Sequence, residues 1–320
     1  MPERYPIKLK PYISETVWGG CRLAEEYGID CRGHANCAEA WVLSAHPRGS
    51  SAVDNGAYAG ISLQALYELE PDWFGEKCAG RERFPILVKL IDAREDLSLQ
   101  VHPGDDDQTV LRPGETGKTE CWYILDAEPG AKLYLGFREA ITKAQFTHAI
   151  ENKTLMSYVQ PFEVEEGDFF YIPAGTLHAI GKGVLLAEVQ QSSDTTYRVY
   201  DYNRLEDGKP RPLHIEQATA VTDLVPYEPA RQKLGLFGSK KLVSNELFTI
   251  DEWSGPFGFS DEAEEDSFVS LVFLDADEDE CKLCCGDDEM LVHKGDCVLI
   301  PAGVGKYSVD GKYRVLVTRL

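Results

Sequence analysis

The sequence of 320 residues lacks long apolar runs and has no excess of positive charge. A membrane-spanning helix requires roughly 18 or more consecutive apolar residues, and no stretch approaches that length. The first residues contain no apolar segment typical of a secretory signal, so we expect none. Lys and Arg number 32 against 54 Asp and Glu, which gives a formal net charge of −22. So acidic a surface argues against binding to nucleic acids or anionic membranes, because both need positive patches.

The cysteines also fail to form a regular framework. There are nine of them, at irregular spacings. An odd number without a pattern indicates reduced thiols in a cytoplasmic protein rather than a set of disulfides. Cys281, Cys284, Cys285 and Cys297 leave two interpretations open, a structural zinc site or small residues in an acidic hairpin. The hairpin is favoured, because no second Cys or His pair follows at the spacing of a zinc finger.

Strand-length apolar segments between turns are frequent, and 43% of the residues are hydrophobic. This pattern predicts an all-β fold with a sizeable core and a few short helices. Helices are expected after Ser62, after Thr142 with a capping box to Gln145, and over 215–222. Residues 1–60 are expected to form short strands and turns. The predicted strands lie at 7–10, 38–43, 84–91, 97–102, 119–125, 162–180, 184–190 and through most of the chain after 242.

One segment occurs twice. Gly167–His178 and Gly295–Lys306 share the pattern Gly-x₅-Pro-x-Gly-x₂-X. In each copy Gly-Asp opens a strand, and Pro-x-Gly turns the chain so that the last residue is expected to face inward. The repeat predicts two related β-barrels. The first covers residues 1–240, with helical insertions at about 62–80 and 142–158, and the second, without a metal, covers residues 241–320.

The segment Leu97–Pro103 carries the first sign of a functional site. Apolar residues alternate with Ser98, Gln100 and His102, so these polar side chains share one face of a strand. Burying an imidazole and an amide without partners costs free energy. A metal ion bound between them would offset that cost.

The segment ending in His178 resembles the second motif of the cupins, a family of double-stranded β-helix (jelly-roll) barrels. The chain as a whole resembles type I mannose-6-phosphate isomerases, in particular the short bacterial form. The resemblance runs from about residue 7 to about residue 220 and continues more weakly beyond. The matching stretches are Val17–Gly20, Glu39–His46, Pro85–Ile91, Leu97–Pro103, Gly117–Tyr123, Ile172–Ile180 and Gln190–Tyr202.

This resemblance implies a zinc site with His102, Glu120 and His178 as ligands. Other divalent metals also suit such a donor set. Gln100 would either be a fourth ligand or contact the ligands without binding the metal itself. The remaining histidines are expected at the surface or at caps, with His214 at the start of a helix. These are His34, His46, His148, His214 and His293.

The resemblance also implies the groups around the substrate. Four are catalytic candidates: Arg198, Lys118, Glu188 and Asp194. Lys89, Lys118 and Arg198 are also substrate-binding candidates, and Ser98, one pleat before Gln100 on the predicted strand, is a fourth. Each has a structural alternative. Arg198 could pair with Asp194 or Asp201, Lys89 could be a sheet-edge residue, Lys118 could lie in a plain turn, and Glu188 could support Arg198.

The expected activity is the interconversion of mannose 6-phosphate and fructose 6-phosphate by proton transfer through an enediol. The residue that moves the proton stays open among Glu188, Asp194, Lys118 and His102, with a carboxylate partnered by Lys118 preferred. One alternative is a non-catalytic, sugar-binding regulatory cupin, and another is a cupin oxygenase, for which Gln100 would make a poorer iron site. The expected partner is a phosphorylated hexose, and the expected state is a cytoplasmic monomer or weak homodimer.

Overall fold

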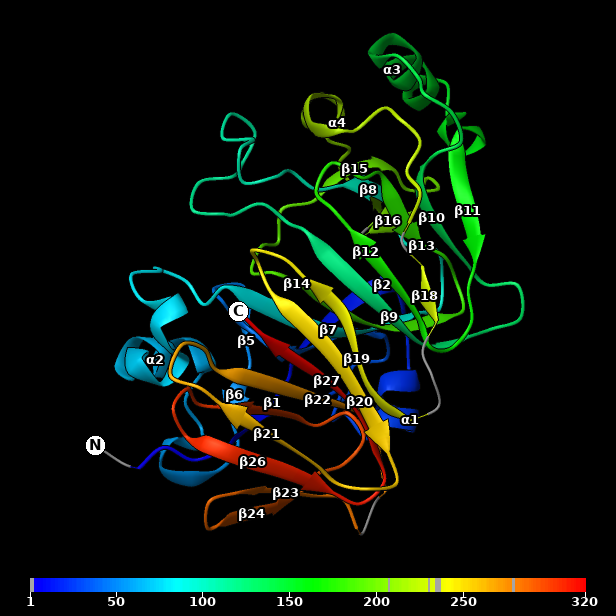
Figure 1. The fold of residues 1–320 in the computed structure, drawn as a ribbon. Coiled ribbons are helices and arrows are strands. Elements are labelled where there is room, and N and C mark those ends of the chain that lie inside the picture. The colour runs from blue at the N-terminus through cyan, green and yellow to red at the C-terminus, as the bar shows by residue number, and fades with distance from the viewer. Residues whose placement is uncertain (1–2, 207, 230, 234–236, 278–279) are drawn as a thin grey trace.

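In this computed structural model, residues 3–206, 208–229, 231–233, 237–277 and 280–320 are described. The chain is mostly β with few helices, which confirms the predicted class (Figure 1). Its helices in these ranges are α1 (Arg22–Tyr27), α2 (Leu63–Leu69), α3 (Lys143–Glu151), α4 (Ile215–Val221) and the short 3₁₀ turns η1 (Gly56–Tyr58), η2 (Pro71–Phe74), η3 (Glu76–Cys78) and η4 (Leu155–Ser157). None of them is long and apolar enough to cross a membrane.

Two facing sheets form the upper half of the molecule in Figure 1. Buried side chains such as Trp122, Leu133, Phe170 and Ile180 pack together in this half. In spatial order, one sheet contains β18 (Gln232–Lys233), β12 (Asp168–Ile172), β9 (Glu120–Ala127), β14 (Val184–Gln191), β7 (Ile86–Ala93), β2 (Tyr12–Gly20) and β3 (Cys37–Leu43). The other contains β11 (Val159–Glu163), β10 (Lys132–Phe137), β13 (His178–Ile180), β8 (Leu99–Val101) and β15 (Tyr197–Tyr200).

The lower half repeats this arrangement. Its core contains Leu271, Phe273, Val298 and Tyr307. One sheet contains β19 (Gly238–Ser244), β20 (Thr249–Gly255), β27 (Tyr313–Arg319), β22 (Val269–Ala276), β25 (Cys297–Ile300), β1 (Ile7–Lys10) and β6 (Ala52–Val53). The other contains β21 (Phe259–Ala263), β26 (Gly305–Asp310), β23 (Lys282–Cys285) and β24 (Asp288–Leu291). Two small hairpins pair β4 (Ala45–His46) with β5 (Gly49–Ser50) and β16 (Leu205–Glu206) with β17 (Lys209–Pro210).

The sequence repeat corresponds to equivalent turns in the two halves. Asp168 accepts a hydrogen bond from the backbone N–H of Glu165, and Asp296 accepts one from the N–H of His293, at 2.9 and 2.8 Å. The strand order β12–β9–β14–β7 has its counterpart in β25–β22–β27–β20, and β10–β13–β8 in β23–β26–β21. The duplication therefore extends well beyond the repeated segment.

The expectation that both repeats end in an inward residue is half wrong. His178 is buried, whereas Lys306 is exposed and its neighbour Tyr307 points into the core. The reason is Gly305, where a φ of 87° turns the chain at the first residue of β26. This conformation favours glycine, because a Cβ would be strained there. The second copy thus turns a tyrosine inward.

The two halves share a core between their inner sheets. Leu90 on β7, Tyr123 on β9, Val272 on β22 and Leu316 on β27 belong to one buried cluster. The N-terminal strand β1 pairs with β25 of the C-terminal half. This arrangement leaves the outer sheet of the upper half, with β8, β13 and β15, free to form one wall of a site.

Local signals predicted most of the helices. The Ser62 hydroxyl accepts a hydrogen bond from the N–H of Ala65, and Thr142 and Gln145 form the predicted capping box. Helix α1 contradicts the expectation that residues 1–60 hold only strands and turns. The sequence gives little indication of this helix, because the side chain of its N-cap residue, Cys21, forms no capping hydrogen bond.

The expectation that all cysteines are reduced thiols is wrong for one pair. Cys31 and Cys37 form a disulfide across the turn between α1 and β3. The seven other cysteines are free. One disulfide between neighbouring cysteines produces no regular spacing among the nine, so the sequence did not reveal which two cysteines are bonded.

Candidate metal and substrate site

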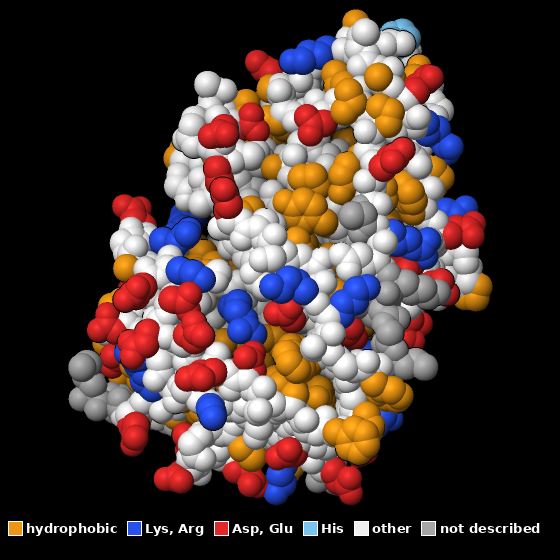
Figure 2. All heavy atoms as spheres, viewed as in Figure 1, with side chains coloured by type: hydrophobic (Ala, Val, Ile, Leu, Met, Phe, Trp, Pro, Cys, Tyr) orange, Lys and Arg blue, Asp and Glu red, His pale blue; other side chains and the backbone are white. Residues whose placement is uncertain are grey.

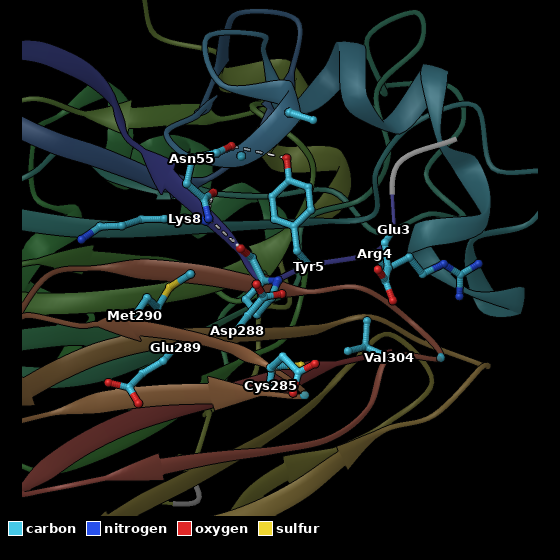
Figure 3. A pocket seen from close by; sticks show the side chains of 16 residues that line it. Glu3, Arg4, Tyr5, Lys8, Asn55, Cys285, Asp288, Glu289, Met290 and Val304 are labelled. Atoms are coloured by element: carbon cyan, nitrogen blue, oxygen red, sulfur yellow. Dashed lines mark hydrogen bonds between the residues drawn. The ribbon is translucent and has the colours of Figure 1, made fainter.

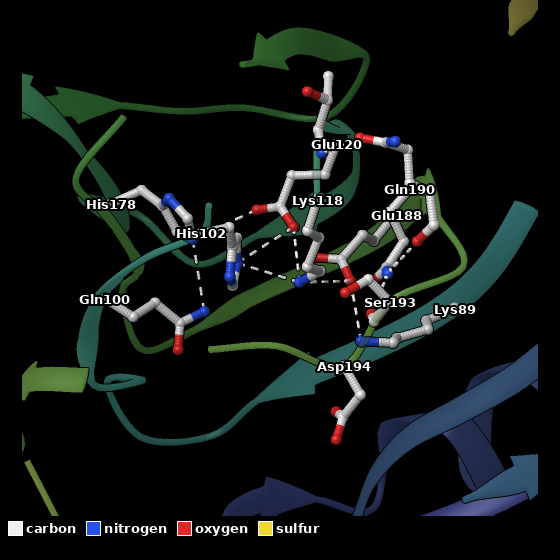
Figure 4. A network of polar contacts seen from close by, with 12 residues as sticks. Lys89, Gln100, His102, Lys118, Glu120, His178, Glu188, Gln190, Ser193 and Asp194 are labelled. Atoms are coloured by element: carbon white, nitrogen blue, oxygen red, sulfur yellow. Dashed lines mark hydrogen bonds and ion pairs between the residues drawn. The ribbon is translucent and has the colours of Figure 1, made fainter. Parts of the chain in front are cut away.

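Three strands of the outer sheet bring the first site residues together (Figure 4). Gln100 on β8 is paired with His178 on β13 and with Arg198 on β15. On the inner sheet, Glu120 at the start of β9 is paired with Gln190 on β14. His102 follows β8 directly, so its side chain shares a face with that of Gln100, as the alternation in the sequence predicts.

Both histidines are held with one ring nitrogen available. Nδ1 of His102 lies 2.8 Å from the carbonyl oxygen of Thr195, and Nδ1 of His178 lies 2.8 Å from that of Thr176. A carbonyl can only accept, so each Nδ1 carries a proton and donates it. Burial lowers the pKa of His178 to about 4 and that of His102 well below its usual range. Neutral imidazoles in this tautomer present an Nε2 lone pair, which is the form that binds a metal.

Glu120 completes a set of acceptors that face one another. Its Oε1 lies 3.3 Å from Nε2 of His178, and its Oε2 lies 3.5 Å from Nε2 of His102. The carboxylate is fully buried, and among the described residues Oε1 has no hydrogen-bond donor. Burial, opposed in part by Lys118, raises the pKa of Glu120. Oε1 of Glu120 and the lone pair of His178 Nε2 thus face each other as two acceptors, which is unfavourable unless a cation binds between them.

His102, Glu120 and His178 are the one group of three or more potential ligands in the described parts of the chain. Two imidazoles and a carboxylate suit zinc, and they also suit manganese, iron or cobalt. The amide of Gln100 lies 3.4 Å from Nε2 of His178, so rotation of the amide can present its oxygen to the same ion. Cys285 lies in β23, which pairs with β24 as a hairpin, and Cys281 and Cys285 are buried in the lower core.

Lys118 links these ligands to a second buried cluster. Its Nζ lies 2.7 Å from Oε2 of Glu120, 3.1 Å from Nε2 of His102 and 3.9 Å from Oε1 of Glu188. Because Lys118 is buried in this network, its interpretation as a plain turn residue is wrong. The side chain instead places a positive charge beside the donor atoms.

Glu188 is held as a carboxylate by its surroundings. Its Oε1 lies 3.0 Å from Nζ of Lys89, and its Oε2 accepts a hydrogen bond of 2.9 Å from Nε1 of Trp122. Burial alone would raise its pKa, but Lys118 and Lys89 outweigh burial, and the pKa of Glu188 is lowered. Lys89 is not an edge residue, because it lies in the middle of the inner sheet with 5% of its surface exposed.

A cavity of about 290 Å³ opens beside this network. Ser98, Gln100, Lys118, Glu188, Asp194 and Arg198 all line it. Arg198 donates from Nε to the Ser98 hydroxyl and from a terminal nitrogen to the carbonyl of Pro212, each at 3.1 Å. The alternative ion pairs do not form, because Asp194 pairs with Arg48, and Asp201 pairs with Arg204 and Arg211.

Several lining residues escaped the sequence analysis. They are Arg48, Arg112 and Arg211 from three separate loops, together with Glu39, Trp41 and His214. No periodicity or motif marks loop residues that meet only in the folded chain. His214 is the N-cap residue of α4, as expected, and Nδ1 of its ring also accepts the backbone N–H of Arg198 at 3.2 Å.

One of the remaining histidines contradicts its expected surface position. His46 is 2% exposed, and its Nε2 lies 3.3 Å from Oε1 of Glu115. The tight hairpin of β4 and β5 turns the ring inward against Trp41. His34, His148 and His293 are exposed, as expected.

A larger cavity, of about 980 Å³, lies in the other half of the molecule (Figure 3). It is bounded by the N-terminal segment around Tyr5 and Lys8 and by residues of β23 and β24 such as Cys285 and Glu289. The potential metal ligands found among the described residues do not line it. Chemistry therefore favours the smaller cavity as the functional site.

The fold and the site together define a protein of paired β-sheets with a buried site for a divalent metal and an adjoining cationic cavity. The family model "Phosphomannose isomerase type I, catalytic domain" matches residues 7–124. Mannose-6-phosphate isomerase ManA of Bacillus subtilis is 37% identical over 98% of this chain and 99% of its own, and the Streptococcus mutans isomerase is 36% identical over 98% of both. The chain belongs to the type I mannose-6-phosphate isomerase family, which confirms the resemblance stated above.

Solved structures agree with this assignment. The crystal structure of the Bacillus subtilis mannose 6-phosphate isomerase matches with a TM-score of 0.90 and 34% identity, covering 99% of this chain and 100% of that one. A zinc-bound mannose 6-phosphate isomerase shares the fold, with a TM-score of 0.76 and 17% identity over 98% of both chains.

Proposed function

We propose that this protein is a zinc-dependent aldose–ketose isomerase that interconverts mannose 6-phosphate and fructose 6-phosphate. The observation that carries the proposal is the convergence of the Nε2 atoms of His102 and His178 on the Glu120 carboxylate, at 3.5 and 3.3 Å, beside a cationic cavity. His102, Glu120 and His178 hold the ion, with Gln100 as the fourth ligand. When bound, zinc supplies a Lewis acid that stabilises negative charge developing on a sugar oxygen.

The residues of the chain supply the other requirements of an enediol mechanism. Arg198 and Ser98, joined by a hydrogen bond of 3.1 Å, orient the phosphorylated sugar, and Arg198 adds positive charge to its binding site. The proton moves between C2 and C1 through the pair formed by Lys118 and Glu188, whose charged atoms lie 3.9 Å apart at the cavity wall. Asp194 lies on the same cavity, in an ion pair with Arg48, and orients the substrate.

The presence of Lys118, Glu188 and Arg198 around one cavity favours an enzyme over a sugar-binding regulatory protein. The test is a coupled assay on purified, zinc-loaded protein with mannose 6-phosphate. The proposal expects formation of fructose 6-phosphate and the reverse reaction from fructose 6-phosphate. Binding of the sugar phosphate without turnover would support the regulatory alternative.

The two halves are cupin-type barrels in this proposal, and the second holds no metal. Ile172 is paired with Glu120, whereas its counterpart Ile300 is paired with the apolar Val269. The boundary near residue 240 is retained, with strands β1 and β6 added to the second barrel. A cytoplasmic location and a monomer or weak homodimer stay predictions.

A further inference from the structure

The basic residues around the cavity differ in whether their charge is already neutralised. Six basic side chains line it: Arg48, Lys89, Arg112, Lys118, Arg198 and Arg211. Four carboxylates line it as well, so basic groups are in excess here in a chain whose formal net charge is −22. A phosphate monoester brings close to two negative charges and is bound best by cations that no carboxylate has already paired.

Four of the six have carboxylate partners. Lys89 lies 3.0 Å from Glu188, and Lys118 lies 2.7 Å from Glu120. Arg211 makes a two-pronged contact with Asp201 at 2.6 and 2.7 Å, and Arg48 pairs with Asp194. Both lysines are also almost fully buried. Recruiting Lys89 to a phosphate would take the nearest cation from the buried carboxylate of Glu188, which is unfavourable. Lys118 lies between two buried carboxylates, those of Glu120 and Glu188.

Arg112 and Arg198 are different. Arg198 donates only to neutral oxygens, those of Ser98 and Pro212. The exposed guanidinium of Arg112 makes no hydrogen bond or ion pair with any residue in the described ranges. Both charges act on His214, whose pKa is lowered by burial first and then by Arg198 and Arg112. Arg112, Arg198 and His214 all line the same cavity.

The loop that carries Arg112 is fixed to the strand that carries Arg198. The hydroxyl of Tyr197, the residue before Arg198, donates a hydrogen bond to the carbonyl of Val110. Asp105 closes the loop by accepting the N–H of Gly117 at 2.7 Å, and the Ser193 hydroxyl donates to the carbonyl of Thr116 at 2.8 Å. These contacts hold the loop in place, and they explain why Arg112, which has no partner among the described residues, lies at the cavity.

We propose that Arg112, together with Arg198, binds the phosphate group of the substrate, and that Lys89 and Lys118 do not. This inference rests on the proposed function and names the residues that select a phosphorylated sugar. Arg112 acts as a specificity residue in this proposal, because it contacts the phosphate and is exposed on a loop that lines the cavity. The lysines keep the carboxylates of the reaction site in place.

The test compares zinc-loaded full-length wild type with Arg112→Ala, Arg112→Lys and the control Arg138→Ala. Arg138 is exposed and does not line the cavity. Loss of a charge-assisted contact should raise KM for mannose 6-phosphate by about 10- to 100-fold in Arg112→Ala, with kcat within about threefold of wild type. Inhibition by inorganic phosphate should weaken by a similar factor, Arg112→Lys should recover part of both, and the control should match wild type.

The outcomes separate this inference from the proposed function. If wild type isomerises mannose 6-phosphate while Arg112→Ala keeps the KM and the phosphate inhibition of wild type, the inference is wrong and the function stands. A raised KM with unchanged phosphate inhibition also contradicts it, because Arg112 would then contact another part of the sugar. If wild type shows no turnover, the proposed function fails. The role of Arg112 is then tested separately, by calorimetric measurement of the affinity of wild type and Arg112→Ala for inorganic phosphate. Equal affinities of the two proteins, or no binding of phosphate by wild type, would overturn the inference.

Discussion

Lys89 and Glu188 are paired residues on the adjacent strands β7 and β14, and Lys89 Nζ lies 3.0 Å from Glu188 Oε1, with both side chains almost fully buried. Removing one partner of a buried ion pair leaves an uncompensated charge. We expect Lys89→Met to lower the free energy of unfolding by about 3–5 kcal/mol. Chemical denaturation followed by tryptophan fluorescence measures this change.

The double variant Lys89→Met with Glu188→Gln provides the control for that prediction. It removes both charges, so it should be more stable than Lys89→Met alone. A single variant as stable as wild type, or a double variant less stable than the single one, would contradict the buried ion pair.

Trp122 positions the other oxygen of the same carboxylate. Its Nε1 donates to Oε2 of Glu188 at 2.9 Å. Trp122→Phe removes the donor and should cost about 1–3 kcal/mol of stability beyond the lost packing, because the buried oxygen stays unsatisfied. It should also lower kcat more than it changes KM.

Trp253 is the matched control, since its Nε1 has no hydrogen-bond partner among the described residues. Trp253→Phe loses ring surface but no hydrogen bond, and it should leave kcat unchanged. Equal effects of the two substitutions on kcat would show that the hydrogen bond to Glu188 has no part in catalysis.

Asp201 gives a pH dependence of stability. Arg211 and Arg204 outweigh its burial and lower its pKa below the usual value. A carboxylate with a depressed pKa in the folded state stabilises the fold above its unfolded pKa, and this contribution is lost as pH falls through the folded pKa. Asp201→Asn should therefore lower Tm at pH 7, and its difference from wild type should shrink below about pH 4.

Thermal unfolding of both proteins between pH 7 and pH 3 measures this difference. A Tm difference that stays constant over the whole range would exclude an ionised Asp201 as its cause.

His178 and Lys306 occupy the same position in the two copies of the repeat, but only His178 faces inward. His178→Ala should reduce zinc content well below one ion per chain and lower activity by at least about 100-fold, since even residues that merely orient metal ligands contribute 10- to 100-fold. Lys306→Ala is the matched control and should keep both. Metal analysis and the coupled assay on the same samples measure the two effects, and full activity of His178→Ala would remove this histidine from the ligand set.

The sequence was sufficient for features that local pattern determines. The β class, the capped helix after Thr142 and the alternation that joins Gln100 to His102 all depend on neighbours in the chain. Family motifs added Glu120 and His178, which the structure brings within reach of His102.

Features decided by tertiary contacts could not be predicted in this way. Lys89 was identified, but its partner Glu188 is fixed by the register of β7 and β14. Arg112 lies in a polar loop like many others, and the contacts that connect this loop to the cavity, such as that of Tyr197 with Val110, form only in the folded chain. The burial of His46 left no signal in the sequence. The strands β4 and β5 of its hairpin have two residues each, too few to show an alternating pattern.

The central claim is that His102, Glu120 and His178 hold the ion on which isomerisation depends. It is tested most directly by removing metal with a chelator and titrating zinc back while mannose 6-phosphate turnover is followed. We predict that the stripped protein is inactive, and that activity returns in proportion to zinc and levels off at one equivalent per chain. Full activity of the metal-free protein, or no turnover at one bound zinc per chain, would contradict the account.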